Sequence, residues 1–219
     1  MNRSRYSGDT PSSGRLPSRS SAVNGVPLGR SRFATRWRNA VRRSARSAGL
    51  GLSPRGYALA TLHRPENVDD PRRLAGILKG LGEVARRLPL VFPVHPRTRA
   101  RLRGLRIPEG VRLRPPLGYL EFLGLMDLSA VVLTDSGGIQ LETSALGVPC
   151  LTLRDTTERP LTCSRGTNRL VGTSPAALLR GVGRVLAHPP KARPHPLWDG
   201  RAAPRIAREI ASWLKARRP

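Results

Sequence analysis

The sequence predicts a doubly wound α/β domain with a parallel sheet, preceded by a basic segment that cannot form a core of its own. From Tyr57 onward, short apolar runs alternate with segments of helical periodicity, which is the pattern of repeated strand-helix units. Residues with special chemistry follow the ends of these runs, where open α/β sheets bind their ligands. We therefore expect a leader at residues 1–55 and one Rossmann-like domain at residues 56–219.

The leader is strongly basic and poor in large apolar residues. Residues 1–55 contain twelve arginines and a single acid, Asp9, in a chain whose formal net charge is +25. Such a segment buries too little apolar surface to offset the entropy of ordering it, so we expect it to be mostly disordered, with at most a short basic helix at residues 34–48. A transit peptide or a nucleic-acid-binding arm would share this composition, but we favour a displaced start or a biased genome.

The strands of the domain are predicted from apolar runs of three to six residues bounded by turn residues. In order, they are residues 57–62, 90–94, 111–113, 130–133, 150–153 and 169–171. The helices are predicted from apolar residues recurring every three to four positions. They are residues 71–87, 119–128, 138–146, 175–187 and 201–215. The last is amphipathic, with Ile206, Ile210, Trp213 and Leu214 along one stripe.

The stretch TDSGGIQLE at residues 134–142 predicts a phosphate-binding turn between a strand and a helix. Without side chains, Gly137 and Gly138 let a diphosphate approach the backbone N–H groups at the positive end of the helix dipole. Ser136 adds a hydroxyl donor, and Asp135 either caps the helix or orients the turn. Glu142, further along the helix, suits a neutral donor such as a ribose diol. The pattern therefore indicates a nucleotide, with an ordinary helix cap as the alternative.

Polar residues follow the other predicted strands in the same way. His63, His95, and the pair Arg154 and Asp155 come directly after the first, second and fifth strands. Because the carboxyl ends of parallel strands meet at one edge of a sheet, we expect these residues to face one crevice with Asp135 and Ser136.

Five segments together resemble the non-hydrolysing UDP-N-acetylglucosamine 2-epimerases. In chain order they are TLHRPEN, PVHPRT, TDSGGIQLE, RDTTERP and GTNRLVG, beginning at residues 61, 93, 134, 154 and 166. The resemblance runs from about Tyr57 to the C-terminus and covers the second half of such an enzyme. It implies the C-terminal domain of a GT-B-type fold. It also implies interconversion of UDP-GlcNAc and UDP-ManNAc, in which UDP is eliminated and then added back.

The resemblance also implies roles for individual residues. His63 lies by the sugar and the diphosphate, where it donates to the leaving phosphate or transfers a proton. Arg64 and Glu66 lie near the substrate or near a regulatory site of some bacterial members, and they can pair with each other. The diphosphate cradle is made by Ser136, Gly137 and Gly138, and Glu142 binds the ribose.

Three further residues complete the predicted site. Arg159 points to the phosphates, and the alternative is that its neighbour Glu158 simply neutralises it. Phe122 either contacts the uracil or belongs to the core, and the two are evenly matched. His95 has a regulatory or a structural role, and we favour a structural loop histidine.

Neither a metal nor a cofactor is expected, because Cys150 and Cys163 make no metal site. The expected ligand is UDP-N-acetylglucosamine or UDP. A homodimer and a separately encoded N-terminal half both stay open as protein partners. The scattered arginines predict no specific nucleic-acid module, and the apolar runs predict neither a membrane span nor a signal peptide, so we expect a cytoplasmic protein.

The family carboxylates that move protons at the sugar lie mostly in the N-terminal domain, which residues 1–56 do not resemble. We therefore expect this chain alone to bind UDP weakly and to turn over little or nothing. Leu117, Leu161 and the segment HPLWDG at residues 195–200 also depart from the family pattern. The alternatives are a non-catalytic UDP-sugar-binding half and a GT-B-type glycosyltransferase-like domain.

Overall fold

The computed structural model describes residues 39, 42–43, 50–191, 193, 197–199 and 201–217. Its strands are β1 (Ala58–Thr61), β2 (Leu90–Pro93), β3 (Val111–Arg114), β4 (Val131–Thr134), β5 (Cys150–Thr152) and β6 (Asn168–Leu170). Its helices are α2 (Pro65–Val68), α3 (Pro71–Ala85), α4 (Pro96–Arg101), α5 (Tyr119–Leu128), α6 (Gly137–Leu146), α7 (Pro160–Ser164), α8 (Pro175–Ala187) and α9 (Ala202–Ala216).

The strands form one parallel sheet in the order β3-β2-β1-β4-β5-β6. This is the strand order of the Rossmann fold, so the predicted doubly wound sheet is confirmed. The order reverses between β1 and β4, and ligands of such sheets bind outside the carboxyl ends of the strands at that point. The topology therefore places a crevice where the loops after β1, β4 and β5 meet.

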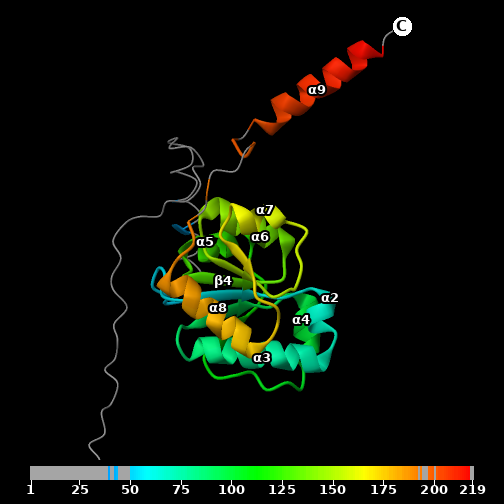
Figure 1. Cartoon of the computed structure of the whole chain (residues 1–219). Helices are drawn as coiled ribbons and strands as arrows, with labels where there is room; N and C mark the ends of the chain where they lie inside the picture. Colours follow the sequence, from blue (N-terminus) through cyan, green and yellow to red (C-terminus); the bar gives the residue numbers. More distant parts are fainter. Residues whose placement is uncertain are drawn as a thin grey trace, which may run out of the picture.

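Helices cover both faces of the sheet, as Figure 1 shows, with α5, α6 and α7 on one side and α3 and α8 on the other. Alternate residues of a strand pack into two cores on opposite faces of the sheet. Ala58 faces the α3 and α8 side, whereas Leu59 faces the α5 side. The apolar periodicity that predicted a helix at residues 71–87 is confirmed by α3, on which Leu74, Ile77 and Leu81 are fully buried. Burying a leucine or isoleucine side chain contributes about 1.5–3 kcal/mol each, so these two cores dominate the stability of the domain.

Three short helices, α2, α4 and α7, were not among the helices predicted from apolar periodicity, although Arg97 and Arg99 had been interpreted as residues at a helix start. They contain four to six residues, too few for an apolar stripe to repeat. Each begins at a proline, whose fixed φ and missing N–H suit the first position of a helix. The prolines were therefore the available signal, since periodicity could not reveal these helices.

The last helix, α9, extends away from the rest of the domain (Figure 1). It is amphipathic as predicted, but none of its residues is buried. The apolar stripe is open to solvent, with Trp213 54% exposed, and the Arg217 guanidinium lies 4.2 Å from the centre of the Trp213 ring. Among the described helices, none is long and apolar enough to cross a membrane.

Part of the predicted leader contacts the domain. Leu50 and Leu52 pack against the core on the α5 side, and the backbone N–H of Arg55 donates to the carbonyl of Leu128 at 2.7 Å. Arg42 forms an ion pair of 2.6 Å with buried Asp127. These contacts lie on the leader side of the predicted boundary at residue 56. The predicted disorder of residues 1–38, most of the predicted helix 34–48, and half of the segment 195–200 fall outside the described residues.

Candidate functional site

The candidate site lies at the carboxyl ends of β1, β4 and β5. In the sheet, β4 is hydrogen-bonded to β1 on one side and to β5 on the other. The loop after β1 carries His63 and Arg64, the loop after β4 carries Asp135 and Ser136, and the loop after β5 carries Arg154. Direct hydrogen bonds and ion pairs join these three loops, so the structure brings them together where the topology predicts the crevice.

Asp135 holds the loop after β1 in place. Its carboxylate is fully buried and accepts the backbone N–H groups of His63, at 3.1 and 3.2 Å, and of Arg64, at 3.0 Å, together with the side-chain amide of Asn67 at 3.2 Å. Burial alone would raise the pKa of this carboxyl, but its hydrogen bonds with His63, Arg64 and Asn67 outweigh that effect and lower the pKa. Of its two predicted roles, Asp135 therefore orients the turn, while Ser136 caps α6 by accepting the N–H of Ile139.

His63 reaches Asp135 with its side chain as well, because Nδ1 lies 3.1 Å from Oδ1. An ionised carboxylate only accepts hydrogen bonds, so Nδ1 carries the proton of this contact, and Nε2 has no hydrogen-bond partner among the described residues. The ring of His95 lies 5.8 Å from the ring of His63. However, Nδ1 of His95 accepts the N–H of Arg97 at the start of α4, which is the structural role we favoured.

The two glycines of the predicted phosphate turn differ in their surroundings. A Cβ added to Gly137 would lie closer than 3.0 Å to Oε1 of Glu158 and 3.2 Å from its Cδ. Gly137 is buried, so its missing side chain makes room for a carboxylate of the chain itself. Gly138 is exposed, and the nearest atom to an added Cβ would be Oγ of Ser136 at 3.7 Å. The predicted close approach of a diphosphate therefore remains open at Gly138 but not at Gly137.

The ion pairs of the site differ from those expected. Oε1 of Glu158 lies 2.6 Å from Nη2 of Arg64, and Oε2 lies 2.6 Å from Nη1 of Arg154. Nε of Arg154 also lies 3.4 Å from Oε1 of Glu66. The expected pairs, Arg64 with Glu66 and Glu158 with Arg159, were wrong. The pKa of Glu158 is lowered to about 2, first by a hydrogen bond to its own backbone and then by Arg154 and Arg64, so the carboxylate is ionised at neutral pH.

Arg159 sits at the start of α7 with an exposed side chain that makes no ion pair with any residue the structure describes. Its backbone N–H donates to Oγ1 of Thr157 at 2.9 Å, and Thr157 donates in turn to Oε1 of buried Gln140 at 2.6 Å. Asn168 donates to the same Gln140 oxygen at 3.1 Å. This network ties the loop after β5 to α6 and fixes the backbone from which Arg159 projects.

Glu142 lies on α6 with one carboxylate oxygen buried and without a hydrogen-bond partner. The other oxygen accepts the hydroxyl of Tyr119 at 3.4 Å. Burial raises the pKa of Glu142, and only the Tyr119 hydrogen bond opposes this effect. A buried oxygen without a donor suits a ligand hydroxyl. Phe122, by contrast, packs partly buried against the core on the α5 side, which favours its packing alternative.

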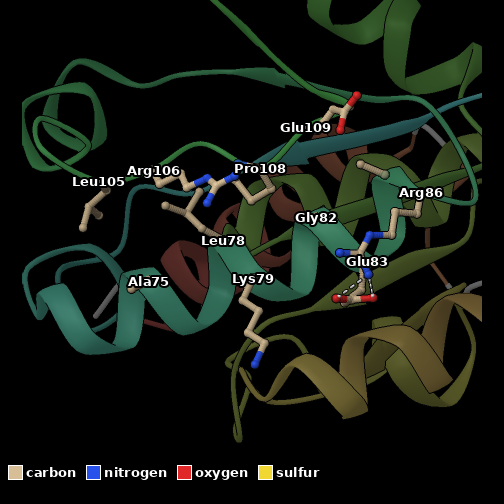
Figure 2. Close-up of a pocket in the computed structure, with 12 residues that line it drawn as sticks. Ala75, Leu78, Lys79, Gly82, Glu83, Arg86, Leu105, Arg106, Pro108 and Glu109 are labelled. Carbon is tan, nitrogen blue, oxygen red and sulfur yellow. Dashed lines mark hydrogen bonds and ion pairs between the residues drawn. The ribbon is translucent and has the colours of Figure 1, made fainter.

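A separate hollow of about 770 Å³ lies along α3 (Figure 2). It is lined by residues of α3 and by the segment that leads into β3, including Leu105, Arg106 and Pro108. It carries charges of both signs, and Glu83 pairs with Arg86 inside it at 2.9 Å. None of the residues lining it follows the carboxyl end of a strand, so we do not assign the candidate site to this hollow.

Sequence reasoning missed several members of the site. Asn67 joins Asp135 to the carbonyl of Leu153 at 3.1 Å, and no individual role had been predicted for it. Arg154 was placed in the crevice without a role, and Gln140 was not considered. Only the position of Arg154 after a strand could have indicated its function, since the other contacts depend on the packing of distant loops.

Residues 30–211 of the chain match the family model described as UDP-N-acetylglucosamine 2-epimerase. A UDP-N-acetylglucosamine 2-epimerase of Methanocaldococcus jannaschii is 40% identical over 160 residues, which are 69% of this chain and 43% of that protein. A UDP-2,3-diacetamido-2,3-dideoxy-D-glucuronate 2-epimerase of Pseudomonas aeruginosa is 40% identical over 164 residues, 74% of this chain and 46% of that protein.

Solved structures give the same result. The structure of the Methanocaldococcus jannaschii UDP-GlcNAc 2-epimerase aligns with a TM-score of 0.67 at 37% identity and covers 78% of this chain and 49% of that one. The Neisseria meningitidis UDP-GlcNAc 2-epimerase bound to UDP-GlcNAc aligns with a TM-score of 0.64 at 31% identity, over 78% of this chain and 48% of that one. The chain thus spans about half the length of the proteins it matches.

Proposed function

Because the chain belongs to the UDP-N-acetylglucosamine 2-epimerase family, we propose that it provides the UDP-binding half of such an enzyme, with its crevice holding the nucleotide. The observation that carries this proposal is the open N-terminus of α6 beside Glu142. Gly138 and Glu142 are four residues apart, so they share one face of α6 and lie about 6 Å apart along its axis. A diphosphate at Gly138 and a ribose at Glu142 would therefore bind along a single helix.

The groups proposed to hold the diphosphate carry either a full or a partial positive charge. The N–H of Gly138 and the dipole of α6 attract an anion, and Ser136 adds a hydroxyl. Arg159 brings a guanidinium that makes no ion pair with the described residues, and guanidinium groups suit phosphate oxygens. In the reaction of the family, UDP leaves C1 of the sugar, and these groups would stabilise the charge that develops on it.

Proton transfer at the sugar requires further groups. Asp135 is held by four N–H donors, and Glu158 and Glu66 are ion-paired with arginines. Among the crevice residues that the structure describes, His63 through Nε2 is the group placed to exchange a proton with the leaving phosphate. We infer that the carboxylates acting at the sugar carbons come from outside this crevice, and that the chain alone binds UDP but turns over little.

The names of the two relatives contain two different UDP sugars. The UDP part is common to the substrates named for the Methanocaldococcus jannaschii and Pseudomonas aeruginosa proteins, which differ in the sugar. The groups described above act on the UDP part. We therefore assign a UDP sugar as the ligand class, with UDP-N-acetylglucosamine as the substrate to test first. A non-catalytic UDP-binding role is the second candidate. It is favoured because the carboxylates of Asp135, Glu158 and Glu66 are already bound by N–H groups or arginines.

The test is proton NMR of UDP-N-acetylglucosamine incubated with the purified chain in deuterated water. Deuterium at C2 would show elimination by this polypeptide, because the family reaction breaks the C2–H bond. An unchanged C2 signal, with UDP still binding, would assign the chain the non-catalytic role. If neither exchange nor UDP binding occurs, the proposed function is wrong.

A further inference from the structure

Glu158 occupies a central position among the charges of the crevice. One carboxylate oxygen binds Arg64, from the loop after β1, and the other binds Arg154, from the loop after β5, each at 2.6 Å. Since β1 and β5 are the two neighbours of β4, this ion-pair chain spans the carboxyl end of β4, where the phosphate turn begins.

The carboxylate also lies against the start of α6. The close approach of Glu158 to Gly137 is possible only because Gly137 has no Cβ. Both guanidinium groups are therefore held beside the helix N-terminus that attracts anions, and Arg154 is only 13% exposed. Two guanidinium groups repel each other unless an anion lies between them, and Glu158 is the anion between these two.

We propose that Glu158 is a positioning residue that holds Arg64 and Arg154 ready to bind the diphosphate of the ligand. This inference rests on the proposed function, because it assumes that a diphosphate binds at the N-terminus of α6. A guanidinium has five donors. Oε1 of Glu158 engages one nitrogen of Arg64, and Oε2 engages one nitrogen of Arg154. The remaining donors of Arg64, whose side chain is 30% exposed, are oriented in advance, so that less side-chain entropy is lost when phosphate oxygens bind.

The experiment compares Glu158→Gln with the unaltered chain by calorimetric titration with UDP and with inorganic pyrophosphate, and by NMR titration with uridine. Glutamine keeps the size of the side chain but holds two guanidinium groups poorly. We expect UDP and pyrophosphate to bind about tenfold more weakly, which corresponds to about 1.4 kcal/mol, while the affinity for uridine stays unchanged. Glu83→Gln, in an exposed ion pair with Arg86, is the matched control and should change none of the three.

A double variant separates positioning from a direct role. If Glu158 acts only through Arg64 and Arg154, adding Glu158→Gln to the variant Arg64→Ala/Arg154→Ala should weaken UDP binding no further. Unchanged or tighter UDP binding by Glu158→Gln would overturn the proposal, as it would show a carboxylate that merely competes with the phosphate. An equal loss for uridine would also overturn it, since the loop would then be generally damaged. Failure of the unaltered chain to bind UDP would instead remove the proposed function, and pyrophosphate binding would still test the arginine pair.

Discussion

Gly137→Ala is expected to weaken UDP binding while leaving the domain almost as stable as before. The new methyl group would lie closer than 3.0 Å to Oε1 of Glu158, so the carboxylate must move away from both of its arginines. The side chain of Glu158 is flexible and 42% exposed, so each screened ion pair contributes at most about 1 kcal/mol to folding. Alanine in place of a helical glycine offsets up to about 1 kcal/mol of that loss. The unfolding free energy should therefore change by no more than about 1 kcal/mol.

Affinity for UDP should fall about tenfold in Gly137→Ala, because Arg64 and Arg154 lose the group that holds them. Urea unfolding followed by circular dichroism measures the stability, and calorimetric titration measures the affinity. Gly183→Ala is the matched control, since Gly183 is helical in α8 and an added Cβ meets no atom within 4 Å. It should keep full UDP affinity. A Gly137→Ala variant that binds UDP as tightly as this control would refute the reasoning.

Three further predictions concern Asp135, Glu142 and α9. Asp135→Asn should lower the unfolding free energy by about 2 kcal/mol at neutral pH, since hydrogen bonds to a buried charge are lost. Because folding lowers the pKa of Asp135, its contribution to the unfolding free energy should be full above about pH 4 and should disappear as the pH falls through the folded-state pKa. Urea unfolding of both proteins at several pH values measures this contribution, and a difference that does not change with pH would contradict the prediction. Because folding raises the pKa of Glu142, Glu142→Gln should stabilise the domain at neutral pH, and this gain should vanish in acid. The same variant should bind UDP more weakly. Thermal melting measures the stability and calorimetric titration the affinity, and a destabilised variant would contradict the burial argument. Acrylamide should quench the fluorescence of Trp213, measured as the difference between the unaltered chain and Trp213→Phe, and a Trp213 that acrylamide does not reach would show that α9 is covered in solution.

Much of the fold could be predicted because its signals are local. The apolar residues of α3 and α8 recur every three to four positions within one short segment; α8 has the predicted bounds, and α3 ends two residues before the predicted end. The sheet order follows from short strand-helix connections. By contrast, α2, α4 and α7 are single turns or little more, and only their first proline distinguishes them from loops.

The contacts within the crevice could not be predicted in the same way. Arg64 and Glu66 are two residues apart at the start of α2, and residues at that spacing do not face each other on a helix. Each instead pairs with the loop after β5: Arg64 with Glu158, and Glu66 with Arg154. Motif spacing placed these residues at one edge of the sheet, but the choice of partners depends on how loops distant in sequence pack together.

The central claim is that UDP binds at the N-terminus of α6, and the most direct measurement is a backbone amide NMR titration of the chain with UDP. We predict that the largest shifts occur at Ser136 and Gly138, with smaller shifts around Glu142 and Arg159. The amides along the hollow beside α3, such as Gly82 and Glu109, should stay unchanged. Shifts confined to that hollow, or no shifts at saturating UDP, would contradict the account.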